Sequence, residues 1–325
     1  VIFESMSDGT EFFHGFNEDR MLGSDLRYRR AFAGHDVVLG AGFLSGRNQM
    51  DALSEEATEK QWALFANDTF DLGRVTLTAG LRYDDLERTD PVWSPSLGAV
   101  CPVGDHLLLR GYVGRGFTAP VITAGVTSPA FGFVGNPDLE VEHVTSYQAG
   151  VEGDVPGFFW YKVTVFRHDV KDALTTITVD DAGNWTYVNQ DDVRRKGLEV
   201  DARTAVFHGF ALEGGASWLD VDNLTREDDF SWNADYKYRV ALSYVGAKGL
   251  RALVNVHNTH WTTPERFHPE ADPVVDLHVS QEFALGEVLL EVFGSANNIF
   301  DGDQFFNEKF PNPGRWLEAG LRCRF

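Results

Sequence analysis

The chain has little of what several classes of protein require. Among its 325 residues are only two cysteines and three methionines, and it contains no run of about 18 apolar residues. A chain without such a run has no membrane-spanning helix. Cys101 and Cys323 lie many predicted strands apart, so we expect two free thiols that act as small apolar side chains.

Positive charge is also scarce. The chain has 28 Lys and Arg against 49 Asp and Glu, which gives a net charge of -21. Such an acidic chain is a poor partner for nucleic acid, because phosphates attract basic surfaces. The excess of acid suits cationic ligands or divalent ions at acidic loops, and it also arises simply from the solubility of polar loops.

Catalytic motifs are absent. The sequence has no CxxC pair, no phosphate-binding P-loop and no HExxH zinc motif. It also shows no set of nucleophile, base and acid in a strand–turn–helix context. We therefore predict that the protein is not an enzyme.

Aromatic residues and glycines are plentiful, at 13% and 32 residues, which favours β-structure with many turns. The clearest strand is the last one, in which every second residue is apolar and the residues between are mostly polar. Its apolar row consists of Leu317, Ala319, Leu321, Cys323 and Phe325. This period of two indicates a strand with one face in an apolar medium. An aromatic end on such a row makes sense if the face meets lipid and the strand closes a barrel.

The same alternation recurs along the chain, as in Val75–Asp84, Tyr236–Tyr244 and Val275–Phe283. Short turns alternate with long polar connections, a layout typical of a bacterial outer-membrane barrel. The long connections lie near 46–58, 85–93, 117–143, 171–193, 220–234, 262–272 and 299–313. We predict an all-β, transmembrane, antiparallel up-and-down barrel with about 15 strands of roughly ten residues each.

The odd number of strands has a consequence. The first strand is expected near Met21–Phe32, and closed bacterial barrels normally have an even number of strands. We therefore expect that something precedes residue 20 or is missing.

Several segments resemble one known family. They are Leu77–Asp84 (LTAGLRYD), Trp93–Gly98 (WSPSLG), Gly114–Pro120 (GRGFTAP), Gly135–Glu142 (GNPDLEVE), Ser146–Gly150 (SYQAG), Asn297–Asp301 (NNIFD) and the ending Pro313–Phe325. In this order and spacing the set resembles the C-terminal part of a TonB-dependent outer-membrane receptor, across nearly the whole chain from about residue 20. One position departs from the family pattern, because Thr118 stands where an arginine is usual.

The resemblance implies a 22-stranded barrel filled by an N-terminal plug, with energy passed from the inner membrane through TonB. The plug, the TonB-contacting box and about seven strands are not in the sequence. We therefore interpret residues 1–325 as the C-terminal part of the barrel domain. Its implied partners are the bilayer, lipopolysaccharide, its own plug, TonB, the barrel-assembly machinery and a small-molecule ligand.

The expected function is active transport into a Gram-negative cell across its outer membrane. The ligand would be scarce or large, such as a metal chelate (a siderophore) or a cobalamin-like molecule. The alternative is a plugless passive pore or a surface-binding barrel without energy coupling. A soluble β-protein is a weaker third possibility.

Two histidines are candidates for a metal or ligand site. His257 and His278 fall in the inward rows of consecutive strands, with Asp276 beside His278. If the connection turns near 267–268, the two histidines become cross-strand neighbours, and the rim above them carries His260, Glu265 and His268. Imidazole and carboxylate suit a transition metal. The alternative is that these polar side chains bond one another across the wall, and a shift of register removes the pair.

An acidic cluster and the chain end complete the candidates. One outer loop carries Asp220, Asp222, Glu227, Asp228 and Asp229, whose oxygens could hold calcium, although the spacing is not that of an EF-hand. A solvated acidic loop, bridged to lipopolysaccharide by divalent ions, is the alternative. The ending with Leu321, Cys323 and Phe325 resembles the signal that the barrel-assembly machinery reads. Inward charges of both signs suit either a plug or a water-filled channel; they are Arg82, Arg110, Arg115, Lys162, Glu199, Asp201, Arg203, Lys237, Arg239, Glu291, Arg322 and Arg324.

Overall fold

The computed structural model describes residues 2–4, 11–225, 233–262, 272–307 and 310–325. Fifteen strands form one antiparallel sheet in which every strand pairs with its neighbours in the chain. This confirms the predicted all-β, up-and-down architecture and the predicted number of strands. Among the described residues, no helix is long and apolar enough to cross a membrane.

The strands of the sheet are long, and most extend beyond the ten residues that the sequence predicts. In chain order they are β3 (Asn17–Phe32), β4 (His35–Met50), β5 (Ala57–Leu72), β6 (Val75–Leu86), β7 (Val92–Val103), β8 (Leu107–Thr118), β9 (Glu142–Val155), β10 (Phe159–Thr178), β11 (Trp185–Thr204), β12 (Phe210–Asn223), β13 (Asn233–Val245), β14 (Leu250–Thr262), β15 (Val274–Leu285), β16 (Val288–Asn297) and β19 (Trp316–Arg324). Two short pairs lie outside this sheet, β1 (Ile2–Glu4) with β2 (Glu11–His14) and β17 (Phe305–Asn307) with β18 (Phe310–Pro311).

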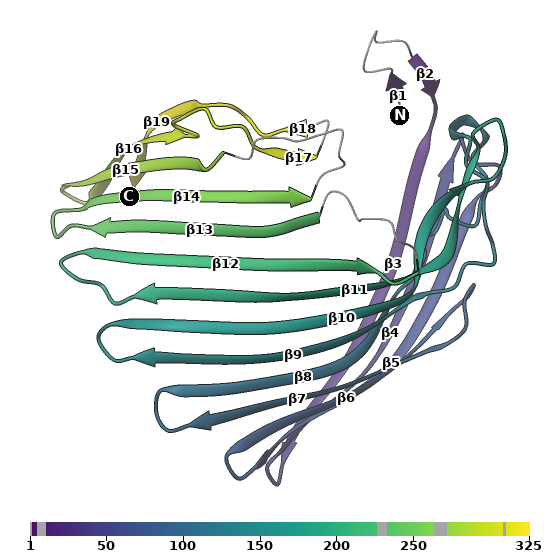
Figure 1. Cartoon of the computed structure of the whole chain (residues 1–325), viewed down its shortest axis with the longest axis horizontal. Coiled ribbons are helices and arrows are strands. Elements are labelled where there is room, and N and C mark those ends of the chain that lie inside the picture. Colours follow the sequence, from purple (N-terminus) through teal and green to yellow (C-terminus); the bar gives the residue numbers. More distant parts are fainter. Residues whose placement is uncertain (1, 5–10, 226–232, 263–271, 308–309) are drawn as a thin grey trace.

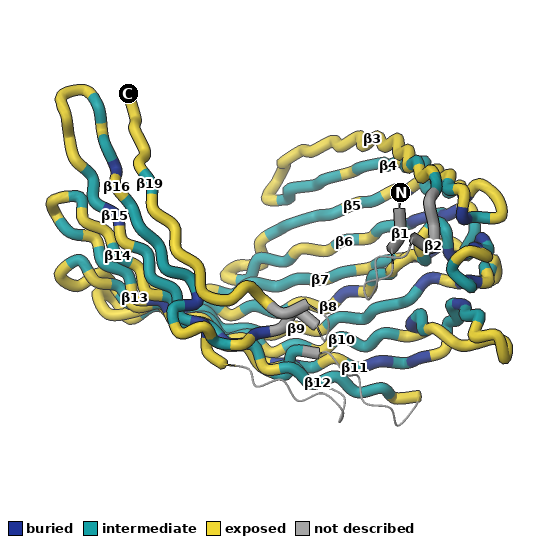
Figure 2. Tube along the Cα trace, turned by 90° about the horizontal axis from the view of Figure 1, so that it is seen from above, coloured by how far each residue is buried: buried dark blue, intermediate teal, exposed yellow. Residues whose placement is uncertain are grey.

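The sheet is strongly curved and open. Its strands lie side by side in chain order (Figure 1), and seen from above they form a trough whose two ends, β3 and β19, stand apart (Figure 2). Within this sheet β3 pairs only with β4, and β19 pairs only with β16. Each of the two outer strands therefore presents one edge that no other strand of the sheet covers.

Connections are sorted by length, as predicted. Seven short turns join the strands at one end, and each contains a glycine with positive φ, which only glycine adopts at no steric cost. These glycines are Gly34, Gly73, Gly104, Gly157, Gly209, Gly249 and Gly286. The longer connections lie at the other end, here called the rim.

The predicted long connection 171–193 is mostly strand. β10 and β11 are 20 residues each and remain paired up to Thr178 and Trp185, which leaves only 179–184 as a loop. A break in register between Val170 and Leu174 bends this hairpin. In the sequence this segment looks like a loop because its threonines are polar. Threonine is nevertheless β-branched, and β-branched residues favour extended backbone.

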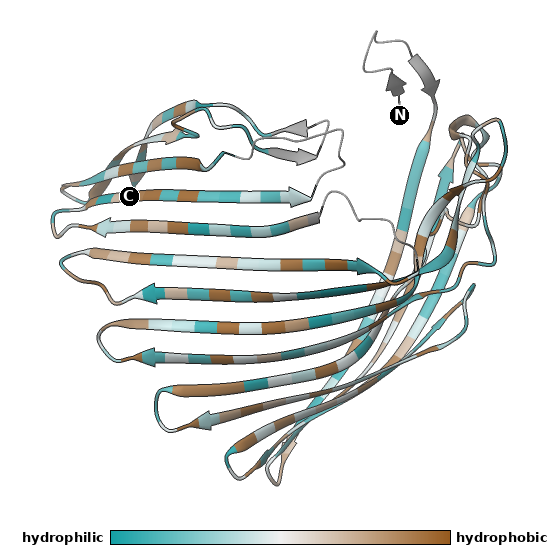
Figure 3. Cartoon of the chain, viewed as in Figure 1, coloured by the Kyte–Doolittle hydropathy of each residue, from teal (hydrophilic) through white to brown (hydrophobic). Residues whose placement is uncertain are grey.

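The two faces of the sheet differ in chemistry. Along the strands hydrophobic and hydrophilic residues alternate (Figure 3), and the cross-strand register places residues of the same row side by side. One face, the apolar face, carries rows such as Leu64 beside Tyr83 and Leu277 beside Ala296. The opposite, polar face carries Arg82, Asp276 and Glu291. A cluster of buried apolar residues lies near the rim, where Leu86, Val92 and Val141 pack together with Phe117.

Candidate functional site

The polar face is a long wall with three hollows. They have volumes of about 380, 610 and 480 Å³. The first is lined by Arg110, Gln148 and Lys162, and the second by Lys237 and His257. All three are broad and open to solvent on this face of the sheet.

Most charges on this wall are paired between neighbouring strands. Arg110 Nη2 lies 3.3 Å from Glu152 Oε2, and Arg322 Nη1 lies 2.7 Å from Glu291 Oε2. Within the described part of the chain, Lys162, Glu199 and Asp201 make no ion pair. The wall therefore has the mixed sign that the sequence predicted. Arg203 and Lys237, which line the same hollows, likewise make no ion pair among the described residues.

The two candidate histidines do not meet. His257 lies opposite Val274 and His278 lies opposite Leu253, four residues further along. The prediction that they are cross-strand neighbours is wrong, because the register between β14 and β15 differs by four residues from the assumed one. Four residues of strand separate side chains by about 13 Å, too far for a shared metal ion.

Each histidine has its own polar neighbours. His257 Nδ1 lies 3.7 Å from Asp276 Oδ2, and the Asn255 amide lies between them, 3.2 Å from His257 Nδ1 and 3.4 Å from Asp276 Oδ2. His278 Nδ1 lies 2.8 Å from Ser295 Oγ on the next strand. Polar side chains thus bond one another across the wall, the alternative that the sequence left open.

The rim histidine lies on the other face. His260 stacks on Tyr236 at 4.7 Å between ring centroids, and its Nδ1 lies 3.4 Å from Asp235 Oδ2. Glu265 and His268 lie outside the described residues. Across the residues with described positions, no three His, Cys, Asp or Glu side chains are grouped as a metal ion requires.

The acidic candidates are divided in the same way. The sequence suggested that Asp220 and Asp222 lie in an outer loop. In the structure both residues belong to β12. The Lys196 ammonium lies 2.8 Å from Asp220 Oδ2 and 3.2 Å from Asp222 Oδ2, and it neutralises part of the charge that calcium would need. Glu227, Asp228 and Asp229 lie outside the described residues.

A packed loop at the rim was not predicted. Residues 119–141, which include the short 3-10 turn η1 (Pro129–Phe131), fold against the projecting β10–β11 hairpin. Phe133 packs on Trp185 at 4.7 Å between ring centroids, and Val134 N donates to Trp185 O at 2.9 Å. The signal in the sequence was Trp185, a tryptophan in a polar stretch.

The segment Gly135–Glu142, which carried part of the resemblance, closes this loop. A Cβ on Gly135 would lie 2.5 Å from the Val126 carbonyl carbon, so only glycine fits there. The Asn136 backbone N–H donates to Ala124 O at 2.9 Å and its side-chain amide to Tyr187 O at 3.0 Å. These contacts hold the loop to itself and to the β10–β11 hairpin.

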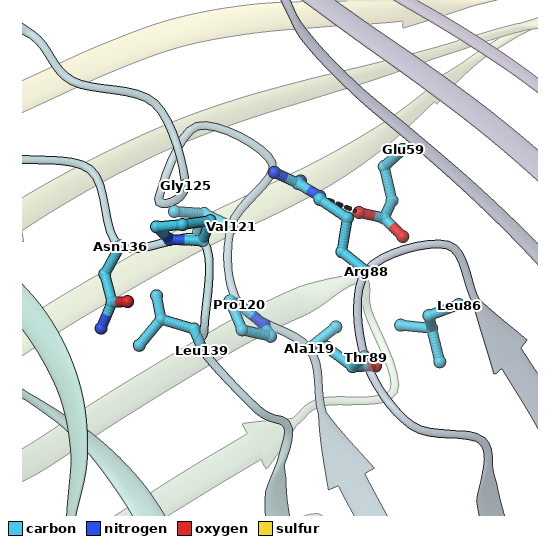
Figure 4. A pocket seen from close by; sticks show the side chains of 11 residues that line it. Glu59, Leu86, Arg88, Thr89, Ala119, Pro120, Val121, Gly125, Asn136 and Leu139 are labelled. Carbon is cyan, nitrogen blue, oxygen red and sulfur yellow. Dashed lines mark hydrogen bonds and ion pairs between the residues drawn. The ribbon is translucent and has the colours of Figure 1, made fainter.

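A small cavity shows how tightly the loop is held (Figure 4). Arg88 Nε donates to Glu59 Oε2 at 2.6 Å, and Arg88 Nη2 donates to Ile122 O at 2.8 Å. The space beside them, lined also by Thr89 and Leu139, is about 30 Å³, which is the size of one water molecule. It is a narrow gap with no room for a substrate.

The chain end lies as the alternation predicted. Leu321 lies beside Val292 and Cys323 beside Leu290, so both are in the apolar row shared with β16. Phe325 follows the end of β19 and is completely exposed. One predicted inward charge is wrong: Arg115 lies beside Thr145 on the apolar face and does not point into the polar wall.

Comparison with known proteins identifies the family. The sequence model described as "TonB dependent receptor-like, beta-barrel" matches residues 3–299. A vitamin B12 transporter, BtuB of Vibrio vulnificus, is 24% identical over 212 residues, which are 60% of this chain and 33% of the transporter. The ferric enterobactin receptor PirA of Pseudomonas aeruginosa is 29% identical over 154 residues, 42% of this chain and 20% of that receptor.

Solved structures show the same fold at low identity. The ferric enterobactin receptor PfeA of Pseudomonas aeruginosa, in complex with enterobactin, superposes with a TM-score of 0.79 at 16% identity and covers 98% of this chain. The FrpB iron transporter of Neisseria meningitidis gives 0.76 at 16% identity and covers 94%. This chain spans 56% and 55% of those two structures, and no more than a third of either curated relative.

Proposed function

Because the chain belongs to the TonB-dependent receptor β-barrel family, we propose that it forms part of an outer-membrane receptor that actively imports a scarce small molecule. The ligand is a metal chelate such as a siderophore, or a cobalamin-like molecule, and energy arrives through TonB. The names of the relatives support both ligand classes, since they include a vitamin B12 transporter and a ferric enterobactin receptor. The observation that carries the proposal is a sheet with one apolar and one polar face whose whole length follows the structures of such receptors.

The apolar face then lies against the outer membrane's lipid, and the polar face lines the lumen. In hydrocarbon, a sheet can expose its side chains but not an unpaired edge, because unpaired N–H and C=O groups cost several kcal/mol each. The free edges of β3 and β19 are therefore joined by further strands of the complete protein. The longer lengths of the matched receptors support this.

The polar wall is suited to hold a plug. Lys162, Glu199 and Asp201 carry charges with no ion-pair partner in the described residues, and they lie beside the hollows of the wall. A plug domain would pair with such charges through hydrogen bonds that water can replace, so that the plug can be displaced. The rim loops, above the wall, would make the first contact with the ligand.

The proposal is tested by uptake. Cells lacking the full-length gene are compared with the parent for import of ferric siderophores and of cobalamin, each with and without a functional TonB. We expect one ligand class to lose uptake in both deletions. Uptake that depends on the gene but not on TonB would replace the active transporter with a passive pore.

The chain end gives a second test of the membrane assignment. We propose that Phe325, with Cys323 and Leu321, is read by the barrel-assembly machinery. Replacing Phe325 by Ala should reduce the amount of heat-modifiable barrel in the outer membrane, whereas replacing the neighbouring polar-face Arg324 by Gln should not. Equal amounts of folded barrel in the two variants would remove this role for Phe325.

A further inference from the structure

The β10–β11 hairpin extends beyond its neighbours in the sheet. β9 pairs with β10 only as far as Lys171, and β12 pairs with β11 only from Val193. Above these residues the two strands of the hairpin pair, within the sheet, with each other alone. We call the segment where the hairpin leaves the sheet the root, because it decides how firmly the hairpin is joined to the sheet.

Backbone pairing is irregular at the root. The register between β10 and β11 shifts twice between Val170 and Leu174. Asp172 lies inside this break with a φ of 57°, a left-handed conformation that a Cβ disfavours. The loss of regular ladder bonds and the strained residue make the root the easiest place for the long hairpin to bend.

Side-chain bonds replace the missing ladder bonds. Asn189 Oδ1 accepts a hydrogen bond from Glu140 N at 2.9 Å, and Asn189 Nδ2 donates to Glu140 O at 2.9 Å and to Asp172 O at 2.8 Å. Leu174 N donates to Glu142 Oε1 at 2.6 Å. The end of the packed rim loop and the start of β9 are thus bonded to both strands of the hairpin.

One imidazole lies within this root. His143 follows the carboxylate Glu142 in β9, and it lies opposite Phe117 of β8 and the cation Lys171 of β10. Its Nδ1 is buried and has no hydrogen-bond partner among the described residues. His143 is six residues, or about 20 Å of strand, above Ala149 of the apolar face. It therefore belongs to the rim and not to the lipid-facing band.

The surroundings favour the neutral form of this imidazole. Burial, and after it the charge of Arg115, lower the pKa of His143 below its ordinary value of 6.5, while Asp172 and Glu140 oppose the shift with smaller effect. A proton on the buried Nδ1 has no acceptor, and such an unpaired charge is costly. The imidazole reaches water only when residues 140–143 move outward, and these residues carry the side-chain bonds of the root.

We propose that the root is an acid-sensitive switch, closed at neutral pH and loosened below about pH 6.5, about which the hairpin and the packed rim loop swing together. Above this pH His143 is neutral whether the root is closed or open. As the pH falls further, the open root binds a proton that the closed root excludes, so closure weakens until the lowered pKa is reached. The contacts between Phe133, Val134 and Trp185 at the hairpin tip contain no titratable group and stay intact.

The test is hydrogen exchange of the full-length protein in nanodiscs, followed by mass spectrometry from pH 7.5 to 5.5 and corrected for the intrinsic pH dependence of exchange. This window lies above the range in which carboxylates ordinarily titrate. We expect the Glu140 and Leu174 N–H groups to exchange at least about threefold faster at pH 5.5. The Val134 N–H, which donates to Trp185 O, should not change.

Three variants identify the group responsible. H143Q should remove the pH dependence, and the matched control H260Q, which changes another rim histidine on the same face, should keep it. K171Q, at an exposed position, should reduce it by removing a cation opposite His143, and it decides the question if H143Q does not fold.

The outcomes are distinct. A parent without pH dependence, or an equal dependence in H143Q, would overturn the switch. Equal acceleration at Val134 would also overturn it, because the whole rim would then loosen and not the root. The switch depends neither on TonB nor on the transported ligand, so it and the proposed function can fail separately.

Discussion

Two rim loops reach a fixed structure by different means. Residues 119–141 fold around buried apolar side chains, with Leu139 4% and Val141 2% exposed. The connection from β16 to β19 is closed instead by polar groups: Gly302 N donates to Asn298 Oδ1 at 2.8 Å, and Arg315 N donates to Asp301 Oδ1 at 2.7 Å. We call them the apolar rim loop and the polar rim loop.

Each loop contains one of the segments that resemble the receptor family, and in each an asparagine anchors the turn. Asn136 holds the apolar rim loop to Tyr187, and Asn298 bonds both the N–H and the C=O of Gly302. In these two loops, the segments that resemble the family therefore stabilise the closed conformation of the loop.

The largest effect is expected from shortening a buried side chain in the apolar rim loop. Leu139→Ala leaves a cavity beside Leu86, and such changes cost about 2–5 kcal/mol. If the loop opens locally, the Asn136 amide, which donates to Ala124 O, should exchange its hydrogen at least roughly 30-fold faster. Hydrogen exchange followed by mass spectrometry measures this.

Val121→Ala is the matched control, because Val121 is in the same loop and 61% exposed. It should leave exchange within about twofold of the parent, as surface substitutions cost about 0.5 kcal/mol or less. If the two variants behaved alike, apolar burial would not be what holds this loop, and its contrast with the polar rim loop would disappear.

A smaller effect is expected in the polar rim loop. Asn298 is 5% exposed and has a positive φ of 48°, so its side-chain bonds and its backbone conformation both contribute. Asn298→Gly keeps the conformation and loses the bonds, which should cost about 1–2 kcal/mol by leaving the Gly302 N–H unpaired. Asn298→Ala should cost roughly 1 kcal/mol more, because a Cβ disfavours that φ.

The readout is hydrogen exchange at Gly302 and Arg315 in both variants. Faster exchange in Asn298→Ala alone would show that conformation, and not hydrogen bonding, closes the polar rim loop. Exchange in the apolar rim loop should not change in either variant, because the hydrogen bonds described for each loop do not join it to the other. A change there would mean that the rim behaves as one unit.

The alternation of single strands predicted most of the sheet. It gave the number of strands, the sorting of turns and loops and the faces of β6, β15 and β19, because a period of two is local information. It misplaced Arg115, where a face was assigned without following the strand from Arg110 residue by residue. It also missed the upper half of the β10–β11 hairpin, since its threonines and charged residues look like a polar loop.

Contacts between strands were harder to predict. The position of His278 relative to His257 depends on where a long connection turns, and an error of two residues there moves the partner by four. The calcium site predicted at Asp220 and Asp222 is unsupported for a related reason, because only the register between β11 and β12 shows that Lys196 lies beside them. Site residues far apart in sequence therefore need the fold before their chemistry can be judged.

The smallest effect concerns the tip of the β10–β11 hairpin, which supports the apolar rim loop but is itself closed by polar groups. The Asn184 side-chain amide donates to Asp180 Oδ2 at 2.7 Å, and the backbone N–H groups of Asn184 and Ala182 donate to Oδ1 at 3.0 Å. These bonds hold the pKa of Asp180 below its ordinary value, and the bond from the Asn184 side-chain amide contributes most.

A carboxylate with a lowered pKa stabilises the folded tip at any pH above the ordinary value of about 4, and the stabilisation is lost as the pH falls through the lowered pKa. The Asn184 side-chain resonance, followed by NMR, should therefore stay constant from neutral pH to about 4 and change only below it. In Asp180→Asn the change should vanish, while exchange at Asn136 should remain that of the parent. Faster exchange at Asn136 in this variant would show that the polar tip and the apolar rim loop are coupled, and that the two modes of closure are not independent even within one side of the rim.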